Sequence, residues 1–278
     1  LQRFMASASK IVEVYYSRPF IVNRSDAKEM SEKLRGGVEF KNVSFSYDGT
    51  PVLKDVSFKI NAGETVAIMG ETGSGKTTLV NMIPRLYDPK RGEVLVDGVN
   101  VRFIKLETLR RNIGMAMQDV LLWSDTIDGN IAFGNSDMPE EDVHRFAHAA
   151  DADNFIANLS DGYETIVGER GVGLSGGQKQ RISLARALAV RPAILILDDT
   201  TSAVDLETEK HIQENLAALD FKCTKIIIAQ RISSAKDADK IIILKDGKIS
   251  ETGTHEELLK NENGYYSEIY RLQQGSVE

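Results

Sequence analysis

A glycine-rich segment carries the residue types that bind phosphate groups. It fits G-x-x-x-x-G-K-[ST] at every fixed position and reads Gly70-Glu71-Thr72-Gly73-Ser74-Gly75-Lys76-Thr77. The glycines let the backbone turn tightly, so that its N–H groups and the positive end of the following helix face the phosphates. We expect Lys76 to reach the β- and γ-phosphates and the Thr77 hydroxyl to take one Mg²⁺ position. A plain glycine-rich turn with a surface lysine is the less favoured interpretation.

Two aspartates end an apolar run at residues 193–197, which is typical of a strand buried on both faces of a parallel sheet. Such a strand presents its functional side chains at its C-terminal end, where open α/β sheets bind ligands. We expect Asp198 to be the carboxylate linked to Mg²⁺ through water. Asp199 stands where a base, or a group that orients the attacking water, belongs. The phosphate-binding segment upstream disfavours the alternative of solvated aspartates at a strand end.

Apolar periodicity predicts the elements that position these residues. Buried strands are expected at 64–69, 193–197, 225–229 and 240–244. A helix is expected to open at 77–82, directly after the phosphate-binding segment. Alternating residues at 38–47 predict antiparallel strand structure, with a bulge where the alternation slips between Phe40 and Val43. The sequence therefore predicts an α/β fold with a mixed or parallel sheet and an antiparallel β subdomain.

A helical subdomain is expected over about residues 119–190. Pro139, followed by two glutamates, predicts a helix start, and a second helix is predicted over 178–190. The pair Thr254 and Glu257 has the spacing of a capping box for a closing helix. The helices of the subdomain would be inserted between strands of the core, and the closing helix would follow the last strand.

The whole set of motifs resembles the nucleotide-binding domain of an ABC transporter, specifically of an exporter, over about residues 36–273. The motif most specific to that family is its signature, Leu174-Ser175-Gly176-Gly177-Gln178. The resemblance implies a P-loop ATPase that binds ATP with Mg²⁺. Its ATP contacts fall on Tyr47, Gly70, Thr72, Gly73, Ser74, Gly75, Lys76, Thr77 and Thr78. Its Mg²⁺ contacts fall on Thr77, Gln118 and Asp198.

The resemblance also implies contacts with partner domains. Gln118 matches a glutamine that senses Mg²⁺ and contacts the membrane domain, and Asp205 ends a loop that crosses the dimer interface. The segment 165–171, which includes Glu169, resembles one that touches cytoplasmic loops of exporters. Trp123 lies in an apolar run that is either a docking surface for the membrane domain or part of the helical core.

The signature has a physical rationale of its own. Ser175, Gly176 and Gly177 precede the helix predicted over 178–190, so their N–H groups and the hydroxyl form an anion site at a helix start. In the family this site acts on the γ-phosphate of ATP held by a second nucleotide-binding domain. Two head-to-tail domains then enclose two ATP molecules. A flexible linker is disfavoured, because the following residues have helical periodicity.

Two positions depart from the family pattern. Hydrolytic members carry glutamate where this chain has Asp199 and histidine where it has Gln230, and none of the four histidines lies near that place. Aspartate retracts the carboxylate by one methylene, about 1.5 Å, and glutamine cannot carry a proton as imidazole does. We therefore predict good ATP binding with poor hydrolysis at this chain's own site, and a heterodimer with a better equipped partner chain. An active homodimer and a regulatory ATP-binding module are the alternatives.

Composition bounds the remaining possibilities. The chain has 278 residues, 42% apolar content and a net charge of −7, which fit one globular domain and argue against nucleic-acid binding. The single cysteine, Cys223, excludes an internal disulfide. An ABC ATPase that acts on DNA would need a long coiled coil between phosphate loop and signature, and residues 78–173 leave no room for one. A translation-type protein would carry two cassettes, and this sequence has one.

The N-terminal residues 1–17 have apolar side chains at helical spacing. We interpret them as the cytoplasmic end of a last transmembrane helix of a longer polypeptide, followed by a linker at 18–35 and the nucleotide-binding domain at 36–278. A free amphipathic helix is the alternative. No apolar run approaches the roughly 20 residues that span a bilayer. The expected partners are a second nucleotide-binding domain and the transmembrane domains of both chains, at the cytoplasmic face of a membrane.

Overall fold

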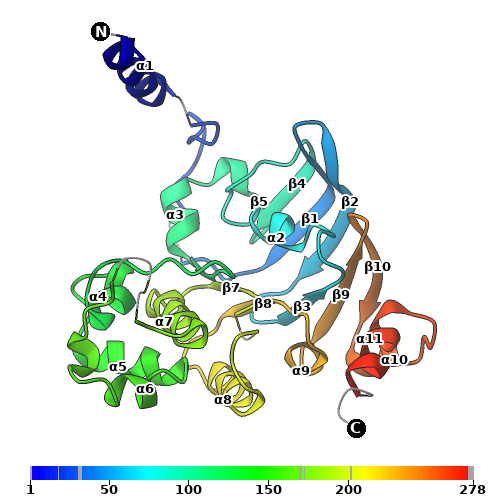
Figure 1. Ribbon diagram of the computed structural model, residues 1–278. Coiled ribbons are helices and arrows are strands. Elements are labelled where there is room, and N and C mark those ends of the chain that lie inside the picture. The colour runs from blue at the N-terminus through cyan, green and yellow to red at the C-terminus, as the bar shows by residue number, and fades with distance from the viewer. Residues whose placement is uncertain are drawn as a thin grey trace.

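The phosphate-binding segment follows a strand inside a six-stranded sheet of the computed structural model (Figure 1), which describes residues 2–17, 19–30, 33–168, 171, 173–200 and 202–274. The strand order is β10-β9-β3-β8-β7-β6. Neighbours from β9 to β6 are parallel, and β10 runs antiparallel to β9. The strands are β3 (Thr65–Met69), β6 (Ile113–Ala116), β7 (Ile194–Asp198), β8 (Thr224–Ile228), β9 (Lys240–Lys245) and β10 (Lys248–Gly253).

The predicted buried strands are confirmed. Every residue of β7 is buried, and β7 pairs on one side with β6 and on the other with β8. A strand enclosed on both faces and both edges needs aliphatic side chains throughout, which explains its unbroken apolar run. Because the strands are parallel, their C-terminal ends lie at the same edge of the sheet, and Asp198 ends β7 there.

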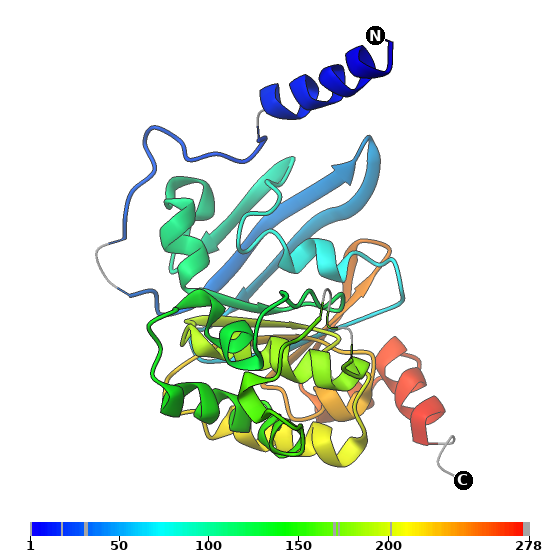
Figure 2. The same cartoon turned by 60° about the vertical axis from the view of Figure 1, so that its left-hand side comes forward.

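A second sheet of four strands, in the order β2-β1-β4-β5, lies between the six-stranded sheet and the N-terminal helix (Figures 1 and 2). Its strands are β1 (Val38–Tyr47), β2 (Thr50–Ile60), β4 (Arg91–Val96) and β5 (Val99–Asn100), and they pair antiparallel. The predicted bulge is confirmed, because the pairing of β1 shifts between Phe40 and Val43. Asn42 adopts φ 48° at this point, which adds the local bend.

The helix predicted to open after the phosphate-binding segment is confirmed, and it is short. Helix α2 covers only five residues, Lys76–Val80. The chain then tightens, since the N–H groups of Met82 and Ile83 donate to carbonyls only three residues earlier, at 3.2 and 3.1 Å. Pro84 disfavours helical backbone at the preceding residue and has no N–H to donate, so the helix ends early.

Four helices form a cluster at one end of the molecule (Figure 1, green). They are α4 (Ile127–Ile131), α5 (Glu140–Ala149), α6 (Asp153–Ala157) and α7 (Gly176–Ala189), and they share one apolar core. The helix start at Pro139 is confirmed, with Pro139 at the N-cap of α5. Helix α7 begins two residues before its predicted start, because Ser175 caps it.

The remaining helices lie outside this cluster. They are α1 (Gln2–Tyr16), α3 (Leu106–Arg111), α8 (Leu206–Ala217), α9 (Ile232–Ala235), α10 (His255–Leu259) and α11 (Tyr265–Gln274). The capping box predicted for Thr254 and Glu257 is confirmed at the start of α10. Helix α1 projects away from the sheets (Figures 1 and 2), and Leu1 lies outside the described residues. No helix in the described part of the chain has the length and apolarity needed to cross a bilayer.

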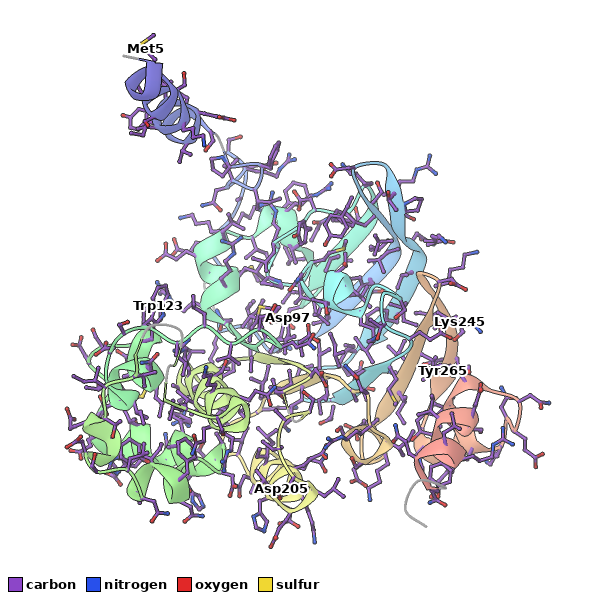
Figure 3. All side chains as sticks on the ribbon, in the orientation of Figure 1. Met5, Asp97, Trp123, Asp205, Lys245 and Tyr265 are labelled. Atoms are coloured by element: carbon purple, nitrogen blue, oxygen red, sulfur yellow. The ribbon has the colours of Figure 1, made fainter. Side chains whose placement is uncertain are left out.

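The chain between α1 and β1 is hydrogen-bonded to the four-stranded sheet and its connections. The Asp97 carboxylate accepts the backbone N–H groups of residues 35–37, at 2.6, 3.3 and 2.7 Å. Farther upstream, the Lys28 N–H donates to the Phe103 carbonyl at 2.8 Å. Asp97 is labelled near the middle of the molecule in Figure 3. These bonds tie residues that carry almost no regular secondary structure to the folded core.

Candidate functional site

The phosphate-binding segment forms a cradle of backbone between β3 and α2. Gly70, Gly73 and Gly75 adopt φ values of 146°, 82° and 103°, which side chains rarely tolerate. A Cβ atom on Gly70 would collide with the Leu244 carbonyl oxygen of β9, so the sheet edge also requires glycine there. The cradle is therefore built into the backbone and does not depend on a bound group to shape it.

Lys76 and Ser74 show that this cradle fits an anion. The Lys76 ammonium donates to the carbonyls of Gly70 and Glu71, at 2.8 Å each. Burial lowers the pKa of Lys76, while Asp198 and Asp199 counteract that shift. The Ser74 hydroxyl oxygen is buried and has no hydrogen-bond partner among the described residues. Phosphate oxygens would accept hydrogen bonds from both the Lys76 ammonium, which now bonds its own loop, and the buried Ser74 hydroxyl.

Thr77 and Asp198 bring two oxygen ligands together. The Thr77 hydroxyl donates to the Asp198 carboxylate at 2.8 Å, and Asp198 is buried. Burial raises the pKa of Asp198, whereas the Thr77 hydrogen bond and the Lys76 charge lower it. Hydroxyl and carboxylate oxygens are the ligands that Mg²⁺ prefers. This pair fits the role of a Mg²⁺ site beside the cradle.

Asp199 collects two amide side chains from neighbouring strand ends. Its Oδ2 atom accepts from Gln230 Nε2 at 2.9 Å and from Gln118 Nε2 at 3.5 Å. Gln118 follows β6, Asp199 follows β7 and Gln230 follows β8, so the shared edge of the parallel sheet assembles the three. Asp199 adopts φ 52°, a left-handed conformation that aspartate tolerates better than most residues. The carboxylate is thus held toward the two amides.

Ionisation of Asp199 is expected to cost stability. Burial is the main cause that raises its pKa, with Asp198 adding to the shift and Ser202, Arg231 and Lys76 opposing it. The folded state then holds its proton above the usual pKa of about 4, so the free energy of unfolding falls as pH rises through that window. Without nucleotide, Asp199→Asn should therefore gain stability over the wild type between pH 4 and 7, by about 2–4 °C in Tm per 1 kcal/mol.

Thermal melts of the wild type and of Asp199→Asn between pH 4 and 7 test this expectation. Asp246→Asn is the matched control, because Asp246 also has a positive φ, 49°, but is exposed on a hairpin turn. It should leave the pH dependence unchanged. An equal Tm difference for Asp199→Asn at pH 4 and pH 7 would contradict the proposed cost of burial.

Tyr47 lies in a cluster of three aromatic rings above the cradle. Its hydroxyl and that of Thr78 are 3.3 Å apart, and its ring packs edge-on against Phe45 and Tyr87, at 4.8 and 5.3 Å between centroids. The ring remains 38% exposed, which leaves a face for a planar ligand. Sequence reasoning missed Tyr87, since no local pattern marks a residue that completes an aromatic cluster from another strand connection.

The signature forms the N-terminus of α7. Ser175 Oγ accepts the Gln178 N–H, and Gln178 Oε1 accepts the Ser175 N–H at 2.9 Å, so the two residues form a capping box. Gly177 packs closely on the Ala203 carbonyl, where a Cβ atom would approach to 2.8 Å. Asp205 in turn caps α8 (Figure 3), and its hydrogen bonds to this helix start lower its pKa.

The signature is separate from the phosphate cradle of its own chain. Among the residues that the structure describes, none of 70–77 hydrogen-bonds to Leu174–Gln178. The buried Gln180 of α7 links the signature helix to the loop after β7, because its side chain donates to the Asp199 carbonyl and accepts the Ala203 N–H, at 3.4 Å each. Sequence reasoning missed this link. The Ser175 end of α7 therefore remains available to something outside its own cradle.

Trp123 is not a core residue. It is 45% exposed and stacks on the exposed ring of Phe133 at 5.3 Å (labelled Trp123 in Figure 3). Asn130, which is fully buried, fixes this loop because its side chain bonds both the N–H and the carbonyl of Trp123, at 2.9 and 3.0 Å. Glu169, in the segment expected to touch cytoplasmic loops, lies outside the described residues.

Comparison with known proteins identifies the family. A family model described as "ABC transporter" matches residues 53–202. The chain is 44% identical over 273 residues to an ATP-dependent lipid A-core flippase of Syntrophus aciditrophicus, covering 98% of this chain and 45% of that protein. It is also 44% identical over 280 residues to ABC transporter B family member 15 of Arabidopsis thaliana, covering 99% of this chain and 23% of that protein.

A solved structure agrees in fold as well as sequence. The structure of a bacterial Atm1-family ABC exporter with ATP bound superposes with a TM-score of 0.91 at 36% identity, covering 98% of this chain and 48% of that one. The chain thus spans half or less of the length of these relatives. The predicted α/β fold is confirmed. This chain belongs to the ABC transporter family, as a nucleotide-binding ATPase domain of the exporter type.

Proposed function

We propose that this chain is the ATP-binding part of a heterodimeric ABC exporter. It holds Mg-ATP in a site of its own that hydrolyses ATP slowly, and it lends its signature to a faster site on a partner chain. The observation that carries the proposal is the Asp199 carboxylate, held at 2.9 Å by the amide of Gln230. Members of the family with full activity resemble this site but carry glutamate and histidine at these two positions.

Binding is supported by the cradle itself. The glycine backbone, the Lys76 ammonium and the unpaired Ser74 hydroxyl present donors to phosphate oxygens, and Tyr47 presents a ring face for adenine. When bound at Thr77 and Asp198, Mg²⁺ supplies positive charge that neutralises the phosphate oxygens. None of these residues departs from the family pattern, so affinity for ATP should be retained.

Slow hydrolysis follows from the two departures. The Asp199 carboxylate is shorter than glutamate by one methylene and is occupied by the amides of Gln118 and Gln230. A displacement of about 1 Å in a positioning group can cost on the order of 10²-fold in rate. The Gln230 side chain offers an N–H donor, but it cannot take up a proton and become positively charged. Both changes fall on the cleavage step and leave the binding residues intact.

The partner is proposed from the intact signature. Ser175 and the first turn of α7 form an anion site that its own cradle does not use, as two head-to-tail domains require. We propose residues 1–17 as the cytoplasmic end of the last helix of a membrane domain, 18–35 as the linker and 36–278 as the nucleotide-binding domain. Gln118, Trp123 and Glu169 are proposed contacts with that membrane domain. The complex would then act at the cytoplasmic face of a membrane.

A single-turnover experiment tests the proposal. With the chain in excess over radiolabelled Mg-ATP, we expect the nucleotide to bind and to be recovered uncleaved. Rapid cleavage by the chain alone would contradict slow hydrolysis at this site and favour an active homodimer.

A steady-state experiment tests the asymmetry in the complex with its partner. There, Ser175→Ala should lower steady-state hydrolysis by about 10²-fold, as the loss of one anion-site donor does, and Asp199→Asn should change it little. Equal losses for both variants would contradict the asymmetry, and no loss for Ser175→Ala would favour a regulatory module.

A further inference from the structure

Gln273, near the end of the C-terminal helix α11, reaches back to the loop that carries Gln230. Its Oε1 atom accepts the Ile232 N–H at 2.8 Å, and its Nε2 atom donates to the Gln230 carbonyl at 3.0 Å. One side-chain amide therefore bridges the backbone on both sides of Arg231. Ile232 and Gln230 lie 41 and 43 residues earlier in the sequence, at the first position of α9 and in the turn after β8.

This bridge replaces a cap that α9 lacks. Helix α9 is only four residues long, and its N-cap residue, Arg231, makes no side-chain capping bond. The first N–H groups of a helix have no partner within the helix and need one elsewhere. Gln273 supplies that partner to Ile232. The start of α9, and hence the exit of the loop from β8, is fixed from outside the local sequence.

The other side of the same loop is anchored to the loop before α8. The Arg231 guanidinium donates to the carbonyls of Ser202 and Val204, at 3.1 and 3.4 Å. Gln230 thus lies in a short segment held by the 202–204 loop on one side and by α11 on the other. From there its side chain reaches Asp199. Loss of either anchor frees the backbone from which that side chain projects.

Helix α11 is a firm base for this contact. The Tyr266 ring is fully buried, and its hydroxyl lies 2.6 Å from a ring nitrogen of His255 at the start of α10. The Tyr265 N–H donates to the Glu251 carboxylate of β10 at 2.7 Å. Figure 1 shows α11 beside α10, at the β10 edge of the six-stranded sheet. Gln273 therefore projects from an element that is itself tied to the sheet.

We propose that Gln273 is a positioning residue that fixes Gln230 relative to Asp199, and that α11 controls the cleavage site through it. The geometry of the bridge stands on the contacts above. Only the link to cleavage rests on the proposed function, which gives Gln230 its role at the γ-phosphate. The inference predicts that Gln273 affects the cleavage step and leaves nucleotide binding unchanged.

Amide hydrogen exchange tests the bridge directly. Gln273→Ala should speed the exchange of the Ile232 N–H roughly tenfold, the effect of losing about one hydrogen bond. Gln273→Glu keeps the acceptor and should retain protection at Ile232. Gln274→Ala is the matched control, because the neighbouring Gln274 bonds the Tyr270 hydroxyl instead, at 2.6 Å. Unchanged exchange at Ile232 in Gln273→Ala, with the fold intact by circular dichroism, would overturn the inference.

A kinetic arm separates positioning from folding. In the Asp199→Glu, Gln230→His chain, adding Gln273→Ala should lower kcat about tenfold and leave the KM for ATP unchanged, whereas adding Gln274→Ala should change neither. A shift in KM alone, or no change in kcat, would overturn the positioning role. If the double variant itself fails to hydrolyse ATP, the proposed function is wrong, and exchange at Ile232 alone then decides the inference about Gln273.

Discussion

Replacing Asp199 with glutamate and Gln230 with histidine is expected to raise the single-turnover rate of ATP cleavage about 10²-fold. The added methylene extends the carboxylate from the backbone by about 1.5 Å, and a correction of this size restores roughly two orders of magnitude in a positioning group. The imidazole replaces an amide that now donates to Asp199 at 2.9 Å with a group able to carry charge. Rapid quench with radiolabelled ATP measures the rate.

The matched control for this gain is Asp199→Asn together with Gln230→His. It changes the same two positions without extending the side chain or keeping the charge, so its rate should stay at the wild-type level or below. The affinity for ATP should be similar in all three chains, because neither position belongs to the cradle. A double variant no faster than the wild type would mean that these two residues do not limit cleavage.

Lys76→Ala is expected to weaken ATP binding by about 10²-fold or more. The ammonium now donates to two carbonyls of its own loop at 2.8 Å, and bound phosphates would receive those donors instead. Each hydrogen bond from a charged group contributes about 1.5–3 kcal/mol, so the loss of two corresponds to at least two orders of magnitude in Kd. Isothermal titration with Mg-ATP measures the change.

Two further variants define what Lys76 contributes. Lys76→Arg keeps the charge, but its planar fork does not fit a cradle shaped for a compact ammonium, so binding should still be weakened. Lys260→Ala, at the exposed C-cap of α10, removes a lysine far from the cradle and should bind ATP normally. An unchanged affinity in Lys76→Ala would remove the cradle from the nucleotide site.

Sequence alone predicted the parts of the fold that depend on neighbouring residues. The strand at β7 was evident because burial on both faces requires aliphatic residues at 194–197, and the start of α5 was evident from Pro139. The extent of α2 was not, since the phosphate-binding pattern marks where a helix opens and Pro84, beyond the motif, decides where it ends. Local sequence patterns predict where a helix begins more reliably than how long it is.

Residues that act across the fold escaped prediction. Gln180 and Gln273 are single amides in helices, and their types and spacing suggest only ordinary helix positions. Their partners, the Asp199 carbonyl and the Gln230 loop, lie 19 and 43 residues away. A hydrogen bond from a side chain to a distant backbone group leaves no periodic trace in either segment. Such contacts become visible only when the strands and helices are placed.

The hydrogen bonds that hold the chain between α1 and β1 to the four-stranded sheet and its connections have a mechanical consequence. A pull along the chain from helix α1 would first load the bond between the Asn23 side chain and the Leu106 N–H, then the Lys28 bond to Phe103, and then the three Asp97 bonds. The tension then passes into β1 and β4, whose antiparallel bonds run across both strands and share it in shear. The nucleotide cradle follows β3 in the other sheet, so the load passes through the four-stranded sheet before it reaches the cradle. Pulling on the N-terminal side of this chain would therefore move the four-stranded sheet before it distorted the cradle.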